Sequence, residues 1–173
     1  MEKIVVRDAE KAMYPSIREQ RINAYREYIE VLPADHWNAL KKSISSTIAE
    51  QEEVELIVAL SGEKMVGSVA LFPTKTNAYE GNIEELDYPE IRMLAVASDA
   101  RGQGVASALI SECIKRTKVK RFNRIGLHTG EFMKNAIDLY EKMGFQRLPQ
   151  YDFIPANDGI IVRAYQLKFS EHE

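Results

Sequence analysis

The stretch VASDARGQGVASALI, residues 96–110, places an arginine, two glycines and several small residues where an apolar strand gives way to a helix. Glycine lets a ligand approach the backbone closely, and the first N–H groups of a helix have no partner within the helix. The helix dipole adds partial positive charge at the same end, so an anionic group is the expected ligand. This stretch therefore predicts a site for a phosphate-bearing molecule.

Two common phosphate-binding turns do not match this stretch. A P-loop needs a Gly-Lys-Ser/Thr ending, which the sequence lacks here. A dinucleotide-binding turn reads GxGxxG, whereas Gly102, Gly104 and Ser107 give GxGxxS. The acidic residue expected about 20 residues later in such a turn is replaced by Arg121 and Arg124.

A third pattern does match. Arg101, Gly104 and Ala106 form RxxGxA, preceded by LAV at 94–96 and followed by NAIDLYEKMGF at 135–145. This combination resembles the Gcn5-related N-acetyltransferase (GNAT) family, whose members transfer an acetyl group from acetyl-CoA to an amine. The resemblance is close over residues 88–147, looser over the hairpin before them, and limited to the order of elements in the first 50 residues.

The resemblance implies an α/β fold of the mixed α+β kind, with a mostly antiparallel sheet of six to seven strands flanked by helices. In such a fold the fourth and fifth strands splay apart, and the pantetheine arm of CoA pairs with the fourth strand in the gap. Asn135 resembles the family asparagine that reaches the CoA arm, and the alternative is that it caps a helix. The cofactor-binding positions implied are Leu94, Ala95 and Val96 for pantetheine, and Arg101, Gly102, Gln103, Gly104, Val105 and Ala106 for the pyrophosphate.

Acetyl transfer to an amine requires a base and benefits from an acid. An alkyl amine with a pKa of about 10 is protonated at neutral pH, and the departing CoA thiolate needs a proton. Tyr140 matches the family tyrosine that acts as general acid, with packing against the sheet as the alternative. Glu90 lies six residues before Val96, the interval of the catalytic glutamate in histone-acetylating relatives, and Glu85 is the reserve. Some members instead use a chain of waters, so the base stays open.

The remaining chemistry-bearing residues favour simpler interpretations. His128 falls on an expected strand and is interpreted as a packed strand residue, and His36 and Trp37 as members of a helix pair. No cluster has metal-ligand spacing, so acetyl-CoA is the only cosubstrate expected, with no metal. A backbone N–H near Leu94 is the expected partner for the oxyanion of the tetrahedral intermediate.

The elements that position these residues follow from hydrophobic periodicity and turn residues. Strands are expected at 3–9, at 54–60 and 65–73 as a hairpin, at 88–96, at 124–129 and at 158–169. Helices are expected at 16–30 after Pro15, at 35–51, at 104–116 and at 134–145, the last ended by Gly144. Trp37, Leu40, Ile44 and Ile48 form one face of the second helix, which is expected to be buried.

Composition indicates one soluble globular domain over residues 1–173, with 45% hydrophobic and 28% charged residues. A net charge of −3 with scattered basic residues argues against nucleic acid as a partner. One cysteine, Cys113, agrees with a reducing cytoplasm, and no apolar run reaches the roughly 18 residues of a membrane helix. Many family members form homodimers, and the sequence does not decide this state.

The acceptor follows less directly from the sequence. Between residues 80 and 90 the chain has five acidic residues and no lysine or arginine. Such a run predicts a negative field that attracts a cationic amine, either a small molecule or a protein amino group, and a solvated acidic loop is the alternative. The sequence thus supports an acetyl-CoA-dependent N-acetyltransferase, with a noncatalytic CoA-binding regulatory or interaction module as the second hypothesis.

Overall fold

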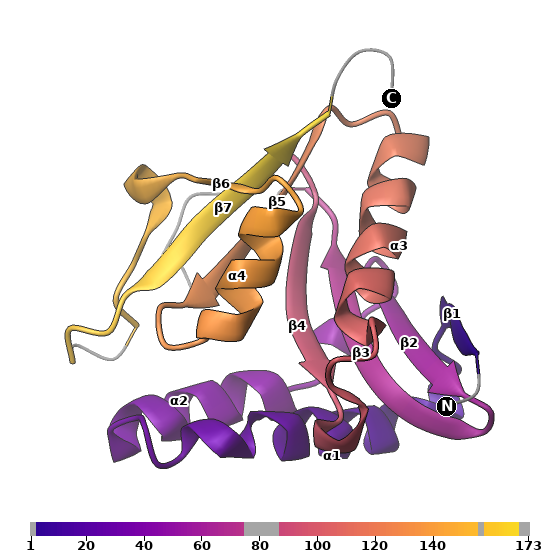
Figure 1. The fold of residues 1–173 in the computed structure, drawn as a ribbon, viewed down its shortest axis with the longest axis horizontal. Helices are drawn as coiled ribbons and strands as arrows, with labels where there is room; N and C mark the ends of the chain where they lie inside the picture. The colour runs from indigo at the N-terminus through magenta and orange to yellow at the C-terminus, as the bar shows by residue number, and fades with distance from the viewer. Residues whose placement is uncertain (1–2, 75–86, 156–157, 170–173) are drawn as a thin grey trace.

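The computed structural model describes residues 3–74, 87–155 and 158–169, and its described strands form one mixed sheet (Figure 1). Their spatial order is β1-β2-β3-β4-β5-β7-β6. All neighbouring strands are antiparallel except β4 and β5, which are parallel, as expected for the mixed sheet. The strands are β1 Ile4–Asp8, β2 Glu55–Ser61, β3 Lys64–Phe72, β4 Glu90–Val96, β5 Arg124–Gly130, β6 Gln146–Arg147 and β7 Val162–Lys168.

The two parallel strands separate soon after they meet. Within the described chain, β4 and β5 pair at Glu90 with Gly126 and at Ile91 with Leu127, and no later pair is formed. Beyond this point the strands diverge, which leaves β4 and β5 on opposite arms of the sheet (Figure 1). The expected splay is confirmed, and it opens one edge of β4 to a ligand.

A β-bulge lies in β4 next to this opening. Ser68 pairs with Ala95 and Ala70 with Arg92, so Met93 and Leu94 together oppose a single residue of β3. Met93 has a φ of 58°, a left-handed conformation that is unusual for a residue with a side chain. A bulge re-aims the backbone groups of a strand and is common beside functional sites.

Four α-helices flank the described sheet: α1 Tyr14–Tyr25, α2 Ala34–Ser45, α3 Val105–Val119 and α4 Lys134–Lys142. Pro15 lies in the first turn of α1, as expected. Both early helices are shorter than expected, and each is followed by a short 3-10 turn, at 26–28 and 48–50. α2 ends at Ser45, after which Ser46 is extended, and the Ser45 hydroxyl donates to the carbonyl of Lys41 at 2.6 Å.

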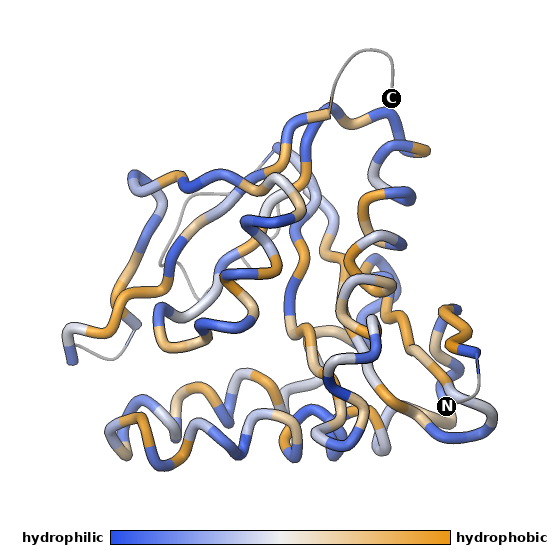
Figure 2. Tube along the Cα trace, viewed as in Figure 1, coloured by the Kyte–Doolittle hydropathy of each residue, from blue (hydrophilic) through white to orange (hydrophobic). Residues whose placement is uncertain are grey.

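The core has two parts, one on each face of the sheet. α3 and α4 cover one face with Leu109 and Ile110 at 0% exposure, and α1 covers the other with Ile17. Hydrophobic and hydrophilic residues alternate along these helices (Figure 2). On the apolar face expected for the second helix, Ile44 is buried, whereas Trp37 and Leu40 are only half-buried. Ile48, also expected on this face, lies beyond the end of α2, in the 3-10 turn, and is half-buried. In the part of the chain that the structure describes, no helix is long and apolar enough to cross a bilayer.

Candidate active site

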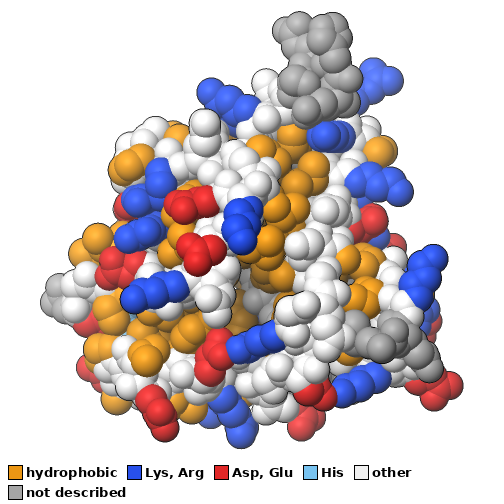
Figure 3. All heavy atoms as spheres, viewed as in Figure 1, with side chains coloured by type: hydrophobic (Ala, Val, Ile, Leu, Met, Phe, Trp, Pro, Cys, Tyr) orange, Lys and Arg blue, Asp and Glu red, His pale blue; other side chains and the backbone are white. Residues whose placement is uncertain are grey.

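A cavity of about 840 Å³ lies between the diverging arms of the sheet. Its walls come from α1, α2, β4, β5, α4 and the turn before α3. The space-filling view shows a hollow near the middle of this face, with hydrophobic side chains around it (Figure 3). Clefts of this size with a few polar groups are the usual form of a small-molecule site.

One end of the cavity is formed by the turn that leads into α3. Gly102 and Gly104 have φ values of +74° and +82°, and a Cβ built on either would meet no atom within 4 Å. Gly104 is the residue before α3, and no side chain caps the helix there. The N–H groups of the first turn therefore face open space in a helix of 15 residues, which is the arrangement that binds anions. Gly102, Gly104, Val105, Ala106 and Ser107 line the cavity at this end.

Arg101, the first residue of the RxxGxA pattern, also lines the cavity. Its guanidinium forms an ion pair with Glu27 and donates to the carbonyl oxygen of Ala24 at 3.0 Å. Arg101 thus ties the end of α1 to the glycine turn. Gln103 is not among the lining residues, and its side-chain amide points toward the carbonyl of Asp99. Any contact of Gln103 with a ligand would therefore be made by its backbone.

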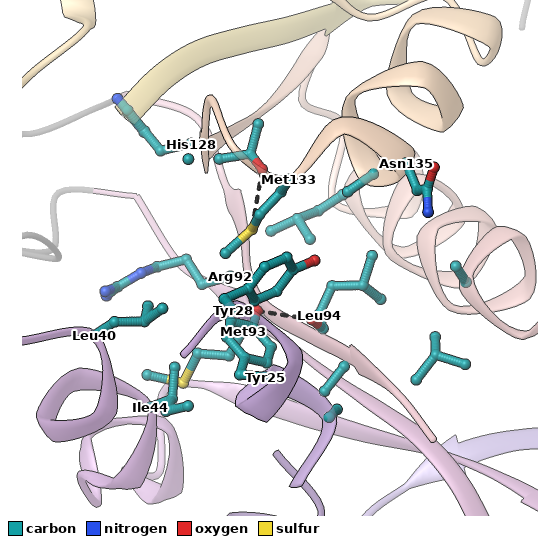
Figure 4. Close-up of a pocket in the computed structure, with 18 of the residues that line it drawn as sticks. Tyr25, Tyr28, Leu40, Ile44, Arg92, Met93, Leu94, His128, Met133 and Asn135 are labelled. Atoms are coloured by element: carbon teal, nitrogen blue, oxygen red, sulfur yellow. Dashed lines mark hydrogen bonds between the residues drawn. The ribbon is translucent and has the colours of Figure 1, made fainter. Parts of the chain in front are cut away.

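The exposed edge of β4 continues the cavity from the turn. Leu94, Ala95 and Val96 all line it. The Tyr25 hydroxyl donates to the carbonyl oxygen of Leu94 at 2.8 Å, which fixes the peptide orientation at the bulge (Figure 4). Burial raises the pKa of Tyr25 to about 12, with Arg21 and Arg92 opposing this rise, so the hydroxyl keeps its proton.

Asn135 lies on the opposite side of the cavity from Leu40 and Ile44 (Figure 4). It is exposed and does not cap α4, because Met133 precedes that helix and no side chain caps it. Asn135 therefore is not a helix cap, and its place at the cavity wall agrees with the other interpretation, a contact with the CoA arm. Its contact with CoA stays a prediction.

Tyr140 comes from α4 and lines the cavity although only 5% of it is exposed. Its ring packs edge-to-face on Phe145 at 5.7 Å between centroids. Burial raises the pKa of Tyr140 well above its ordinary value, and the nearby Tyr25 adds to the rise. The hydroxyl therefore stays protonated and can act as a proton donor, not as a base.

Glu90 is buried at the point where β4 and β5 still pair, and it is not among the residues that line the cavity. Its Oε2 lies 3.0 Å from Nδ1 of His128, a lining residue, whose Nε2 lies 3.1 Å from the carbonyl oxygen of Tyr151. His128 is thus a packed strand residue with a buried side chain, as interpreted from the sequence, and its ring also contacts Glu90. Sequence reasoning missed this pair because it depends on the register of β4 against β5, which places residue 128 next to Glu90.

The acidic run before β4 is only partly described. Glu80, Glu84 and the reserve base Glu85 lie outside the described residues. Asp87 pairs with Arg124 at 3.2 Å, and Glu90 with His128, so these two carboxylates are already engaged. Among the described residues there is no group of histidine, cysteine and carboxylate side chains that could hold a metal ion.

Comparison with known proteins places this arrangement in a family. Residues 12–145 match the family model described as the acetyltransferase (GNAT) family. The chain belongs to the GNAT family. The glycine turn, the splayed strands and Tyr140 all fall within the matched range of this GNAT domain.

Curated relatives of the GNAT chain are N-acetyltransferases. It is 35% identical over 94 residues to N-acetyltransferase 8B of Rattus norvegicus, covering 54% of this chain and 40% of the relative. It is 31% identical over 112 residues to N-acetyltransferase 8F1 of the same organism, covering 65% and 48%. The chain therefore spans less than half the length of these two relatives.

Solved structures share the fold of the GNAT chain over nearly its whole length. A GNAT acetyltransferase from Staphylococcus aureus aligns with a TM-score of 0.71 and 14% identity, covering 97% of this chain and 100% of the other. PaiA N-acetyltransferase from Thermoplasma acidophilum, solved in complex with coenzyme A, aligns with a TM-score of 0.70 and 14% identity, covering 96% and 99%.

Proposed function

We propose that this GNAT chain transfers the acetyl group of acetyl-CoA to a primary amine of a small molecule or protein, by direct attack in a ternary complex. One observation carries the proposal: a single cavity is lined by the uncapped start of α3, the bulged edge of β4 and Tyr140 of α4. This is the order in which the pyrophosphate, pantetheine and thioester follow one another in acetyl-CoA. The family match and the curated N-acetyltransferase relatives support the same activity.

The residues around the cavity fit the cosubstrate that the family implies. Acetyl-CoA supplies an activated acyl group and three phosphate groups. The N–H groups of Gly104, Val105 and Ala106 would hold the pyrophosphate, and the absence of side chains at Gly102 and Gly104 leaves room for it. The backbone of 94–96 would pair with pantetheine as an added strand does.

In the proposed reaction the neutral amine nitrogen attacks the thioester carbonyl carbon. A C–N bond forms, the carbonyl oxygen becomes negative, and the N–H of Leu94 would stabilise that charge. The C–S bond then breaks, and the thiolate takes the proton of the Tyr140 hydroxyl. The nitrogen loses one proton before attack, when the ammonium form becomes the free amine, and one after attack. A base takes these protons, and a proton returned through solvent restores the Tyr140 hydroxyl.

Glu90 is the proposed base, and the structure adds His128 as its partner. The carboxylate and the imidazole lie 3.0 Å apart, and both side chains are buried. Only His128 of the pair lines the cavity, so a proton would reach Glu90 on that side of the pair, after the contact of Nε2 with the Tyr151 carbonyl opens.

Glu90→Gln is expected to lower kcat at pH 7 by about tenfold while leaving CoA affinity unchanged. The defect should shrink as the pH approaches about 10, because the free amine then exists without help from a base. Asp87→Asn is the matched control, since Asp87 pairs with Arg124 outside the cavity wall. Measured pH profiles of kcat that coincide for Glu90→Gln and the unaltered protein would remove Glu90 from the mechanism.

The proposed function is tested by incubating the protein with acetyl-CoA and a panel of primary amines while CoA thiol release is followed. Release well above a protein-free blank with at least one amine, together with mass detection of the acetylated amine, is the expected result. The second hypothesis is a noncatalytic CoA-binding module. It predicts CoA binding by calorimetry with thiol release no faster than the blank across the panel.

A further inference from the structure

The end of the cavity away from the glycine turn has a wall of bulky apolar side chains. Leu40 and Ile44 of α2 lie on the side opposite Asn135, with Met93 of β4 beside them and Met133 above (Figure 4). Phe132, Phe153 and Pro155 also line the cavity. Leu40 is half-buried in α2, with Ile44 buried next to it on the same face of the helix.

A row of four rings stiffens this wall. Tyr28 packs edge-to-face on Tyr25 at 6.0 Å and on Phe132 at 5.1 Å, and Phe132 packs on His36 at 5.6 Å. Phe132 also covers Gly130 so closely that a Cβ there would lie 2.4 Å from the ring. Edge-to-face contacts and close packing hold the rings in one arrangement, so the wall is preformed.

The carboxylates around the described part of the cavity each contact a basic side chain. Glu27 lines the cavity and pairs with Arg101. Glu90 and Asp158 pair with the lining residues His128 and His36, at 3.0 and 2.8 Å. Lys42 and Arg92 add positive charge to the wall. A polycation would therefore meet repulsion here, whereas an uncharged apolar group would gain from burial.

We propose that the acceptor is a primary monoamine carrying a bulky aromatic or aliphatic group, and that Leu40 and Phe132 set this specificity. The inference rests on the proposed acetyl transfer and names its substrate class. It narrows the cationic amine expected from the acidic run at 80–90 to a monoamine with an apolar group. The amine nitrogen would point toward Leu94 and Tyr140, and the apolar group toward α2 and Phe132.

The substrate class is tested by kcat/KM for n-propylamine, n-hexylamine, 2-phenylethylamine and spermidine. Each buried CH₂ should raise kcat/KM by about fourfold, so n-hexylamine should exceed n-propylamine at least tenfold. Spermidine should fall at least about tenfold below 2-phenylethylamine. Equal values for the short and long monoamines, or spermidine as the best substrate, would overturn the proposal.

Binding distinguishes failure of this inference from failure of the proposed function. Calorimetric titration of 2-phenylethylamine and spermidine into the CoA-saturated protein needs no turnover. If 2-phenylethylamine binds more tightly than spermidine but no thiol is released, the apolar amine-binding site is supported and the proposed acetyl transfer is rejected. Preference for spermidine would overturn the inference whether or not acetyl transfer occurs.

The two specificity residues are tested by variants with a charged control. Leu40→Glu places a carboxylate in the apolar wall, and it should raise the ratio of kcat/KM for spermidine to that for 2-phenylethylamine at least about tenfold. Phe132→Ala should raise KM for 2-phenylethylamine while CoA affinity stays constant. Val119→Glu, at a 74% exposed position on α3, should alter neither value. If Leu40→Glu binds CoA normally and its ratio of kcat/KM for spermidine to that for 2-phenylethylamine is unchanged, Leu40 does not set the specificity.

Discussion

Gly104→Glu is expected to weaken CoA binding by about 100-fold or more, equivalent to about 3 kcal/mol. A residue with a side chain pays about 1–2 kcal/mol to keep the left-handed φ of +82° that Gly104 adopts. The new carboxylate also occupies the space in front of the helix start and repels the pyrophosphate. Calorimetric titration with CoA measures the change directly.

Gly104→Glu should lower the stability of α3 much less than it lowers CoA affinity, because a negative charge near a helix start interacts favourably with the helix dipole. Gly62→Glu is the matched control. Gly62 has a φ of +61° in the exposed turn between β2 and β3, so the same strain is introduced away from the cavity. Gly62→Glu should bind CoA normally, and equal loss of affinity in both variants would show that strain alone explains the effect.

Tyr140→Phe is expected to lower kcat by about 100-fold, the usual contribution of a general acid, with little change in CoA affinity. The phenylalanine ring keeps the packing on Phe145 and removes only the hydroxyl. Steady-state kinetics at saturating acetyl-CoA and a calorimetric CoA titration measure the two quantities. Unchanged kcat would exclude Tyr140 as the acid.

The raised pKa of Tyr140 also predicts a pH dependence. A raised pKa favours the neutral phenol, so Tyr140 stays protonated across the ordinary assay range. The kcat profile should therefore show no decline on the alkaline side up to about pH 10 from loss of this proton. Tyr165→Phe is the control, because the Tyr165 hydroxyl bonds Glu141 at 3.2 Å outside the cavity wall and its loss should leave kcat unchanged.

The parts of the site that depend on local sequence were predictable. Glycines with positive φ are required by the turn into α3, and Gly144 likewise ends α4 with a φ of +98°. Small residues at this turn and the NAIDLYEKMGF segment are contiguous patterns, so they identify the family and the strand order that comes with it. The mixed sheet and the splay of β4 and β5 follow from that family pattern.

The parts that depend on long-range contacts were not predictable. The pairing of His128 with Glu90 depends on the register between β4 and β5, whose first residues, Glu90 and Arg124, are 34 positions apart in the sequence. Likewise, His36 meets Asp158 across 122 residues, and Phe132 meets Tyr28 only in the folded chain. The apolar end of the cavity, near α2 and Phe132, therefore could not be predicted from the sequence.

The most direct test of the account is a crystal structure of the chain with bound CoA. Pyrophosphate oxygens are expected about 2.7–3.2 Å from backbone nitrogens among Gln103, Gly104, Val105 and Ala106. The pantetheine arm is expected along Leu94 to Val96, and the sulfur beside the Tyr140 hydroxyl. A CoA molecule whose pyrophosphate lies away from the start of α3 would contradict the proposed cofactor site.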